Sequence, residues 1–237
     1  MVTMNELLSK VLLASVLLVN AGLAQTYTTK FDGEENPLSE GGRWTNEGLD
    51  WAKIRKSGGI AYGTETGTNT GSRMYDDSIA QLSGFPPDQE AWGVVYIARP
   101  NASCRQELEI LLRRTTSAHN ATGYECYARC INSDKSYVTI VRWDGPIGKY
   151  TTLLERHGPD YGLKNGDVLK ASIVGNVITV YINGIKKAQV TDDTFKTGSP
   201  GIGEWLYCPE GRGVGSNSDY GFSSFTARGI GGADAAR

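Results

Sequence analysis

Hydrophobic and polar residues alternate with a period of two along much of the chain. The pattern is clearest in four short segments rich in β-branched and aromatic residues: 92–100, 104–114, 123–131 and 136–145. Asn, Gly, Ser and Asp separate these segments, which is typical of strands joined by turns. Few segments show the longer period of an amphipathic helix. We therefore expect an all-β protein.

Residues 167–192 predict a meander of three strands. Gly175-Asn176 and Asn183-Gly184 divide this segment, and Asn-Gly favours the tight turns that match the twist of paired strands. A last strand is expected over 218–227. Many strands without alternating helices predict an antiparallel two-sheet β-sandwich.

The N-terminal residues have the pattern of a secretory signal. Lys10 precedes an apolar run that ends in small residues just before Gln25, and the run is too short to span a membrane comfortably. We expect a signal peptide over 1–24, one domain over 25–228 and a flexible tail over 229–237. A secreted, extracellular or periplasmic protein without a membrane span in its mature chain is the expectation.

The charge balance narrows the class of partner. The chain has 24 Lys and Arg against 26 Asp and Glu, a formal net charge of -2 at pH 7. Glu6 and Lys10 cancel within the signal segment, so the mature chain keeps this charge. A near-neutral chain gives no reason to expect nucleic acid as a partner.

Four cysteines in an exported chain favour disulfides over a zinc site. Disulfides persist outside the cytosol, and only two histidines are available as further zinc ligands. Four thiols allow three pairings, and the sequence does not choose among them. The cysteines are Cys104, Cys126, Cys130 and Cys208.

Three segments carry a resemblance to a known superfamily. They are "KFDGEENPLSEGGRWTN" (30–46), "ITVYINGIKKAQVTDDTFKTGSPGIG" (178–203) and "SDYGFSSFTA" (218–227). The chain resembles the concanavalin A-like jelly rolls, including the laminin-G-like domains of secreted bacterial proteins. The resemblance implies a jelly-roll scaffold. Because this scaffold hosts lectins, glycosidases and polysaccharide lyases, it also implies a role with glycans.

The segment "CRQELEILLRR" (104–114) is the first candidate for chemistry. Alternation puts Arg105, Glu107 and Glu109 on one face of a strand. Jelly-roll glucanases use a strand of the form Glu-x-Asp-x-x-Glu or Glu-x-Asp-x-Glu, and here the third acid is replaced by Leu111 or Leu112. Without its acid/base, a glycoside hydrolase of that type is disfavoured.

A polysaccharide lyase acting on a uronate-containing glycan is the first alternative. Jelly-roll alginate lyases carry Arg-(Ser/Thr)-Glu-Leu-Arg, which "RQELE" matches in part, but the other two strand motifs of those lyases are missing. β-Elimination needs a group that neutralises the carboxylate and a base that takes the α-proton. The candidates are Arg105 or Arg142 for neutralisation, and Tyr137, Tyr124 or His157 as base.

Carbohydrate binding is the leading hypothesis. Aromatic rings pack against the apolar faces of sugars, while charged groups hydrogen-bond to their hydroxyls. We expect the hollowed sheet to carry Arg105, Glu107, Glu109, Arg142 and Trp143 as ligand-binding residues.

Two simpler interpretations stay open beside it. The charges of 104–114 are also typical of a solvated strand, in which Glu109 pairs across to Arg129 or Arg142. An extracellular structural or assembly module that contacts further subunits is the second alternative function.

A structural Ca²⁺ is expected where the first and last strands meet. We expect Asp32 to lie on the first strand and Asp219 to open the last, and in jelly rolls of this type the terminal strands often lie together. Ca²⁺ takes six to eight oxygen ligands, main-chain carbonyls included, so two acids would suffice as side-chain ligands.

Overall fold

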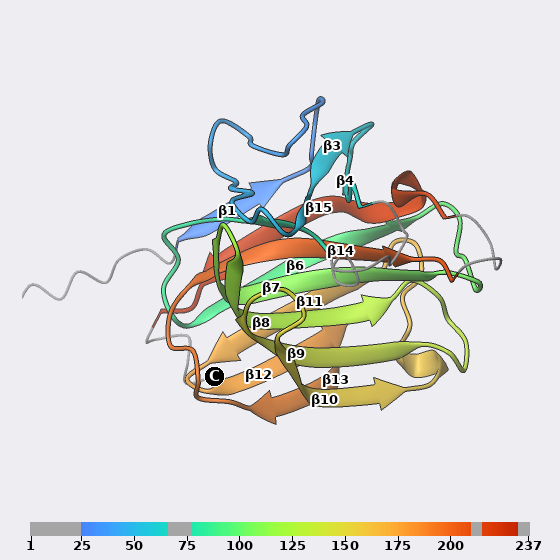
Figure 1. Ribbon diagram of the computed structural model, residues 1–237. Helices are drawn as coiled ribbons and strands as arrows, with labels where there is room; N and C mark the ends of the chain where they lie inside the picture. Colours follow the sequence, from blue (N-terminus) through green and yellow to red (C-terminus); the bar gives the residue numbers. More distant parts are fainter. Residues whose placement is uncertain (1–24, 66–76, 210–214, 232–237) are drawn as a thin grey trace, which may run out of the picture.

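Two packed β-sheets make up the protein. The computed structural model describes residues 25–65, 77–209 and 215–231, and regular helix in these residues is limited to two single 3₁₀ turns, η2 (Pro159–Tyr161) and η3 (Asn217–Asp219). Figure 1 shows the sheets stacked one behind the other. The predicted all-β, two-sheet sandwich is confirmed.

One sheet contains eight strands in the described residues. Its order is β13-β12-β11-β6-β15-β4-β3, and β1 pairs with β15 beside this path. Its strands are β1 (Thr26–Thr29), β3 (Arg55–Ser57), β4 (Ile60–Tyr62), β6 (Gln89–Ile97), β11 (Val168–Val174), β12 (Val177–Ile182), β13 (Ile185–Thr191) and β15 (Tyr220–Gly229).

The second sheet contains seven strands in the described residues. Its order is β10-β9-β8-β7-β14-β5-β2, and β2 runs parallel to β5 whereas the other pairs are antiparallel. Its strands are β2 (Ala52–Lys53), β5 (Ser78–Gln81), β7 (Arg105–Ser117), β8 (Asn120–Arg129), β9 (Tyr137–Gly145), β10 (Tyr150–His157) and β14 (Ser199–Tyr207).

The predicted meander forms as β11, β12 and β13. Asn183 and Gly184 between β12 and β13 have φ of 52° and 75°, the left-handed values that a two-residue mirror-image turn requires. The predicted neighbourhood of the chain ends also forms, because β1 pairs with β15 from Thr26 opposite Arg228 to Thr29 opposite Phe225.

The main core lies between the two sheets. On β7, Leu108, Ile110 and Leu112 are fully buried in it. Alternation therefore turns Glu107 and Glu109 to the outer face of the seven-stranded sheet, away from the core. A smaller apolar cluster lies on that outer face, made of Trp51, Ile79, Leu111, Ala121, Val141 and Trp143 with Tyr127 and Ile147 packed against it.

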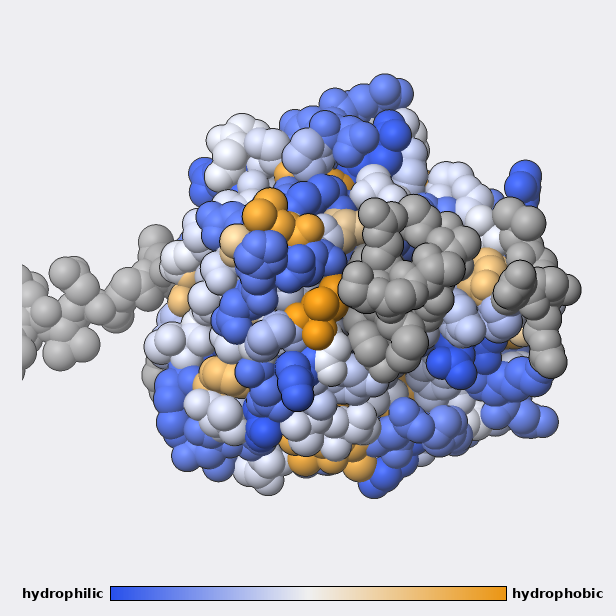
Figure 2. All heavy atoms as spheres, viewed as in Figure 1, coloured by the Kyte–Doolittle hydropathy of each residue, from blue (hydrophilic) through white to orange (hydrophobic). Residues whose placement is uncertain are grey.

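The surface seen in Figure 2 is mixed, with small hydrophobic groups separated by hydrophilic residues. The large hydrophobic side chains exposed among the described residues are scattered along the sequence: Leu49, Tyr150, Val177 and Ile185. None of the helices in the described residues is long and apolar enough to cross a membrane.

The expected signal peptide over 1–24 lies outside the described residues. At the other end, the boundary of the domain is later than the expected residue 228. β15 reaches Gly229, whose N–H donates to the Gln25 carbonyl, and the Ile230 N–H donates to the Asp88 carbonyl. Most of the expected tail, residues 232–237, is outside the described part.

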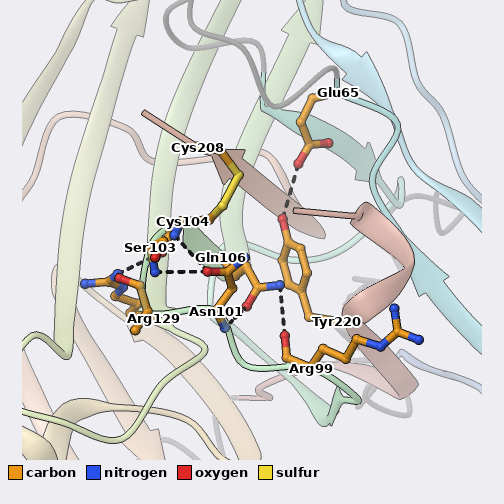
Figure 3. Close-up of a disulfide and its surroundings, with 10 residues drawn as sticks. Glu65, Arg99, Asn101, Ser103, Cys104, Gln106, Arg129, Cys208 and Tyr220 are labelled. Atoms are coloured by element: carbon orange, nitrogen blue, oxygen red, sulfur yellow. Dashed lines mark hydrogen bonds between the residues drawn. A yellow bond between two sulfur atoms is a disulfide. The ribbon is translucent and has the colours of Figure 1, made fainter. Parts of the chain in front are cut away.

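One disulfide joins Cys104 to Cys208 (Figure 3). It links the residue before β7 to the residue after β14, at the same end of two adjacent strands. Hydrogen bonds surround it, among them one from Arg129 Nη2 to the Cys104 carbonyl at 2.8 Å. Cys126 and Cys130 are buried free thiols, so one of the pairs that the sequence allowed is formed.

Candidate functional site

A hollow of about 540 Å³ lies on the outer face of the seven-stranded sheet. Strands β7, β8, β9, β10 and β14 contribute to its lining, together with Asp77, the residue before β5. The charged or titratable lining residues, apart from tyrosines, are Asp77, Arg105, Glu107, Glu109, Glu125, Glu155 and His157. The aromatic ones are Tyr127, Tyr137, Trp143, Tyr150, Trp205 and Tyr207, and Val141 completes the lining.

Cross-strand register explains why these residue types meet. Glu109 lies opposite Tyr127 of β8 on one side and opposite Gly203 of β14 on the other. Residues directly opposite in a ladder share a face, so the pairing sets acids beside aromatic rings. A Cβ atom at Gly203 would lie 1.9 Å from Glu109 Oε2, so this glycine leaves the space that the Glu109 carboxyl occupies.

Three carboxyl groups converge on the floor of the hollow. Asp77, Glu109 and Glu125 each have an oxygen atom, and these atoms lie within 4.8 Å of one another. All three side chains are buried, and Glu109 Oε2 has no hydrogen-bond partner in the part of the chain that the structure describes. Glu125 accepts a hydrogen bond from Trp143 Nε1 at 2.7 Å, which fixes its position.

A β-bulge brings Arg114 to the same face. The register between β7 and β8 shifts between Leu112 and Thr115, and Arg113 has a left-handed φ of 46°. The bulge breaks the alternation of the strand, so Arg114 follows Glu109 to the outer face. Its guanidinium carbon lies 5.1 Å from the Trp143 ring centroid and 5.9 Å from that of Trp51.

Arg114 is 1% exposed, and none of its three side-chain nitrogens has a hydrogen-bond partner among the described residues. Its positive charge acts on Glu125, Asp77 and Glu109, and it lowers the pKa of each of these acids against the effects that raise it. One buried cation therefore faces three buried acids.

Burial dominates the electrostatics of the acids. It raises the pKa of Asp77 and Glu109 well above the usual carboxyl range, and the negative charge of Glu125 raises both further. Burial also raises the pKa of Glu107 to about 8, although a short hydrogen bond from the Tyr137 hydroxyl opposes this shift. Carboxyl groups held in this way both donate and accept hydrogen bonds near neutral pH.

The raised pKa of Glu107 gives a prediction for stability. Between about pH 5 and about pH 8 the folded state keeps a proton that the unfolded state releases, so the free energy of unfolding should fall as pH rises. Acids whose pKa is lowered in the folded state, such as Glu40 and Asp192, change the free energy of unfolding at lower pH, outside this window. Urea melts at several pH values measure the slope.

Glu107→Gln is the matching variant, because the amide oxygen still accepts from Tyr137. The slope between pH 5 and pH 8 should become shallower in this variant. An equal slope in the variant and the parent protein would contradict the assignment of the proton to Glu107.

All three predicted site residues on β7 lie in the hollow. Arg105, Glu107 and Glu109 line it, as the alternation predicts. Arg105 is exposed at one end, with its guanidinium carbon 5.9 Å from the Trp205 ring centroid and 5.8 Å from that of Tyr207. The solvated-strand interpretation is wrong for the two acids, since Glu107 is 5% and Glu109 1% exposed.

Three further predicted residues, Tyr137, Trp143 and His157, also line the hollow. Tyr137 donates to Glu107, and Trp143 forms one wall with its ring against Trp51, at 5.8 Å between centroids. His157 is exposed and pairs with Glu155 through Nε2.

Arg142 does not lie where the sequence predicted it. It does not reach the hollow, because it alternates with Val141 and Trp143 on β9 and therefore points to the other face. Its Nε donates to Asp144 and its Nη1 to Asp192, each at 2.6 Å. Tyr124, a candidate base, is likewise buried on the core side, where its hydroxyl donates to Asp192 at 2.7 Å.

The expected pairing of Glu109 with Arg129 or Arg142 also does not form. Tyr127 is the residue opposite Glu109, and Arg129 lies opposite Glu107 one step along the ladder.

The calcium expectation remains a prediction. The Asp219 carboxylate forms an ion pair with Arg99 at 3.7 Å, and Asp32 is an exposed residue. Within the described ranges, the trio on the floor of the hollow is the one group of three acidic, His or Cys side chains whose ligand atoms converge. Arg114 beside that trio is an unfavourable neighbour for a metal ion.

Sequence reasoning missed several lining residues. Glu125 lies in a segment with visible alternation, on the same face as Tyr127, so the register of β8 could have indicated it. Asp77 and Arg114 carry no such signal, since one precedes a short strand and the other follows a bulge. Tyr207 also went unassigned.

The chain matches no protein-family profile and no curated protein sequence. Solved structures do resemble it. The carbohydrate-binding module CBM66 from Bacillus subtilis is 16% identical, with 72% of this chain and 96% of that one covered and a TM-score of 0.52. The CBM2 module of the evolved Dit protein of Lactobacillus casei BL23 phage J-1 is 11% identical, with 86% and 96% covered and a TM-score of 0.57.

An enzyme is also similar. The endo-β-1,3-glucanase from Pyrococcus furiosus is 11% identical, with 87% of this chain and 94% of that chain covered and a TM-score of 0.53. The chain has the concanavalin A-like jelly-roll fold. Identities this low show the fold alone, so the function has to be inferred from the hollow of this protein itself.

Proposed function

We propose that this jelly roll binds a carbohydrate chain in the hollow of its seven-stranded sheet. The observation that carries the proposal is the convergence of six aromatic rings with carboxyl groups in one hollow. Aromatic faces pack against the apolar faces of sugar rings, and carboxyl groups hydrogen-bond to the hydroxyls around the edges.

Trp205 and Tyr207 form the stacking surface at one end. Their ring centroids are 5.6 Å apart with 19° between the planes, and both rings lie beneath the guanidinium of Arg105. Two near-parallel rings held by a charged neighbour offer a preformed surface for a sugar. Little side-chain entropy is lost when the ligand binds such a surface.

The test is a glycan array followed by calorimetry with the glycan retained most strongly. Trp205→Ala should weaken its binding by about 10- to 100-fold, the loss expected for a stacked ring of about 1–3 kcal/mol. Trp92→Ala is the matched control, because Trp92 packs beneath Lys170 on the eight-stranded sheet. Equal losses in the two variants, or none in either, would contradict the proposal.

The uronate lyase gains little support from this site. Five carboxyl groups line the hollow, against the guanidinium of Arg105 and the imidazole of His157, so a polyuronate would meet a largely acidic lining. Burial and the charge of Glu107 raise the pKa of Tyr137, which makes its hydroxyl a poor base. The assembly module stays a prediction.

Glycoside hydrolysis is the second candidate, and a specific observation favours it. The sequence lacks an acid at Leu111, but Glu125 of the neighbouring strand lies opposite Leu111 in the ladder. Its carboxyl oxygen comes within 4.8 Å of one of Glu109. Retaining glycosidases separate their two carboxyls by about 5–5.5 Å.

Release of reducing ends from the retained glycan tests this second function. Glu125→Gln should lower the rate by at least about 100-fold if Glu125 is an acid or base in the reaction. An unchanged rate in this variant would exclude that role, and no release by the parent protein leaves binding alone.

We also propose an oxidising compartment, extracellular or periplasmic. The Cys104–Cys208 disulfide supports this location, because thiols stay reduced in the cytosol.

A further inference from the structure

We propose that the hollow selects sugars with a free amine, whose ammonium group lies among Asp77, Glu109 and Glu125. This inference rests on the proposed carbohydrate-binding function and names the class of sugar. It reverses the expectation of a uronate ligand. Two features of the hollow support it: its acidic lining and a buried carboxyl oxygen without a hydrogen-bond partner among the described residues.

Acidic groups outnumber basic ones at every level of the hollow. One guanidinium and one imidazole line it, and both are engaged: Arg105 stacks on the rings beneath it, and His157 pairs with Glu155. On the floor, three acids face the single guanidinium of Arg114. A ligand that carries a positive charge therefore gains a favourable electrostatic interaction with these acids, which a neutral or anionic sugar lacks.

One carboxyl oxygen on the floor has unused hydrogen-bonding capacity. Glu109 is 1% exposed, and its Oε2 is buried without a hydrogen-bond partner among the described residues. A buried oxygen without a donor is costly to the folded protein. An ammonium group carries three donors, so it can serve Glu109 together with the two neighbouring carboxyls.

The walls fit an organic cation better than a metal ion. Ca²⁺ needs six to eight oxygen ligands, whereas the sides of this hollow are largely rings such as Trp143 and Tyr127. Ring faces attract ammonium groups and pack against the sugar that carries them. A divalent ion on the floor would also lie beside the Arg114 guanidinium, whereas one ammonium charge is repelled less.

The three acids on the floor of the hollow repel one another. After burial, the charge of Glu125 is the largest cause that raises the pKa of Asp77 and Glu109. A bound ammonium group would relieve this repulsion.

Calorimetry with two oligosaccharides of equal length tests the inference. The probes are glucosamine oligomers and N-acetylglucosamine oligomers, which differ only in acetylation of the amine. The mature chain should bind the glucosamine oligomer at least about tenfold more tightly. Glu109→Gln keeps the shape, removes the charge and should abolish this preference.

Glu204→Gln is the matched control. Glu204 is a buried glutamate on β14 that faces away from the hollow and accepts from the Gly63 N–H, so the preference should persist in this variant. Thermal melts of both variants show that each is folded at the assay temperature.

Three results would overturn the inference: equal or tighter binding of the acetylated oligomer, no binding of the glucosamine oligomer, or binding that a chelator abolishes. The proposed function fails separately, if no glycan of any class is retained or if Trp205→Ala leaves retention unchanged.

Discussion

Replacing Arg114 with methionine is expected to lower the free energy of unfolding by about 3–5 kcal/mol at pH 8, the cost of leaving buried charges without their partner. Arg114 is the cation among Asp77, Glu109 and Glu125. Without it, these acids must either repel one another or hold extra protons. At pH 5 protons are abundant, so the loss should be smaller there.

Urea denaturation at both pH values measures the effect. Arg114→Lys keeps the charge and should retain most of the stability. A second variant, Arg114→Met with Glu109→Gln, should recover part of the loss, because it removes one of the unpaired acids. A loss independent of pH, with no recovery in the double variant, would show that Arg114 acts through packing against Trp143 and not through its charge.

Removing the Cys104–Cys208 disulfide is expected to cost about 2–5 kcal/mol. The two cysteines are separated by 104 positions, so the bond closes a long loop and restricts the unfolded chain strongly. Cys104 is fully buried, so replacement by serine adds the cost of a buried hydroxyl. Cys104→Ala with Cys208→Ala avoids this addition.

Thermal melts with and without a reductant check this prediction. The double alanine variant should melt below the parent protein, and reductant should lower the melting temperature of the parent alone. Cys126→Ala, at a buried free thiol, is the control for the loss of a cysteine side chain. A parent protein unaffected by reductant, with a variant of equal stability, would show that the bond does not hold the folded state.

The scaffold could be predicted because it depends on local patterns. The two-residue alternation predicted the strands, and the Asn183-Gly184 turn joins β12 to β13 as expected. The same alternation correctly predicted that Glu107 and Glu109 share one face of the strand. It could not predict their burial, because a solvated charged strand face and a hollow lined with acids have the same sequence pattern.

The composition of the site depends on the register between strands, which the sequence does not show. Glu125 joins Glu109 only because β8 pairs with β7 in one register. Arg114 reaches the hollow through a bulge, and Arg142 misses it by one step of the alternation on β9. Asp77 comes from a segment remote in sequence, next to a strand of four residues. Non-local pairing placed Glu125 and Asp77, and the bulge placed Arg114, whereas the alternation that keeps Arg142 out of the hollow is visible in the sequence.

A crystal structure of the mature chain with the glycan that the array retains most strongly tests the central claim most directly. The account predicts a sugar ring against Trp205 and Tyr207, with the chain of sugars running over Glu109. An ordered glycan elsewhere, such as on the outer face of the eight-stranded sheet beside Trp92, with the hollow empty, would contradict it.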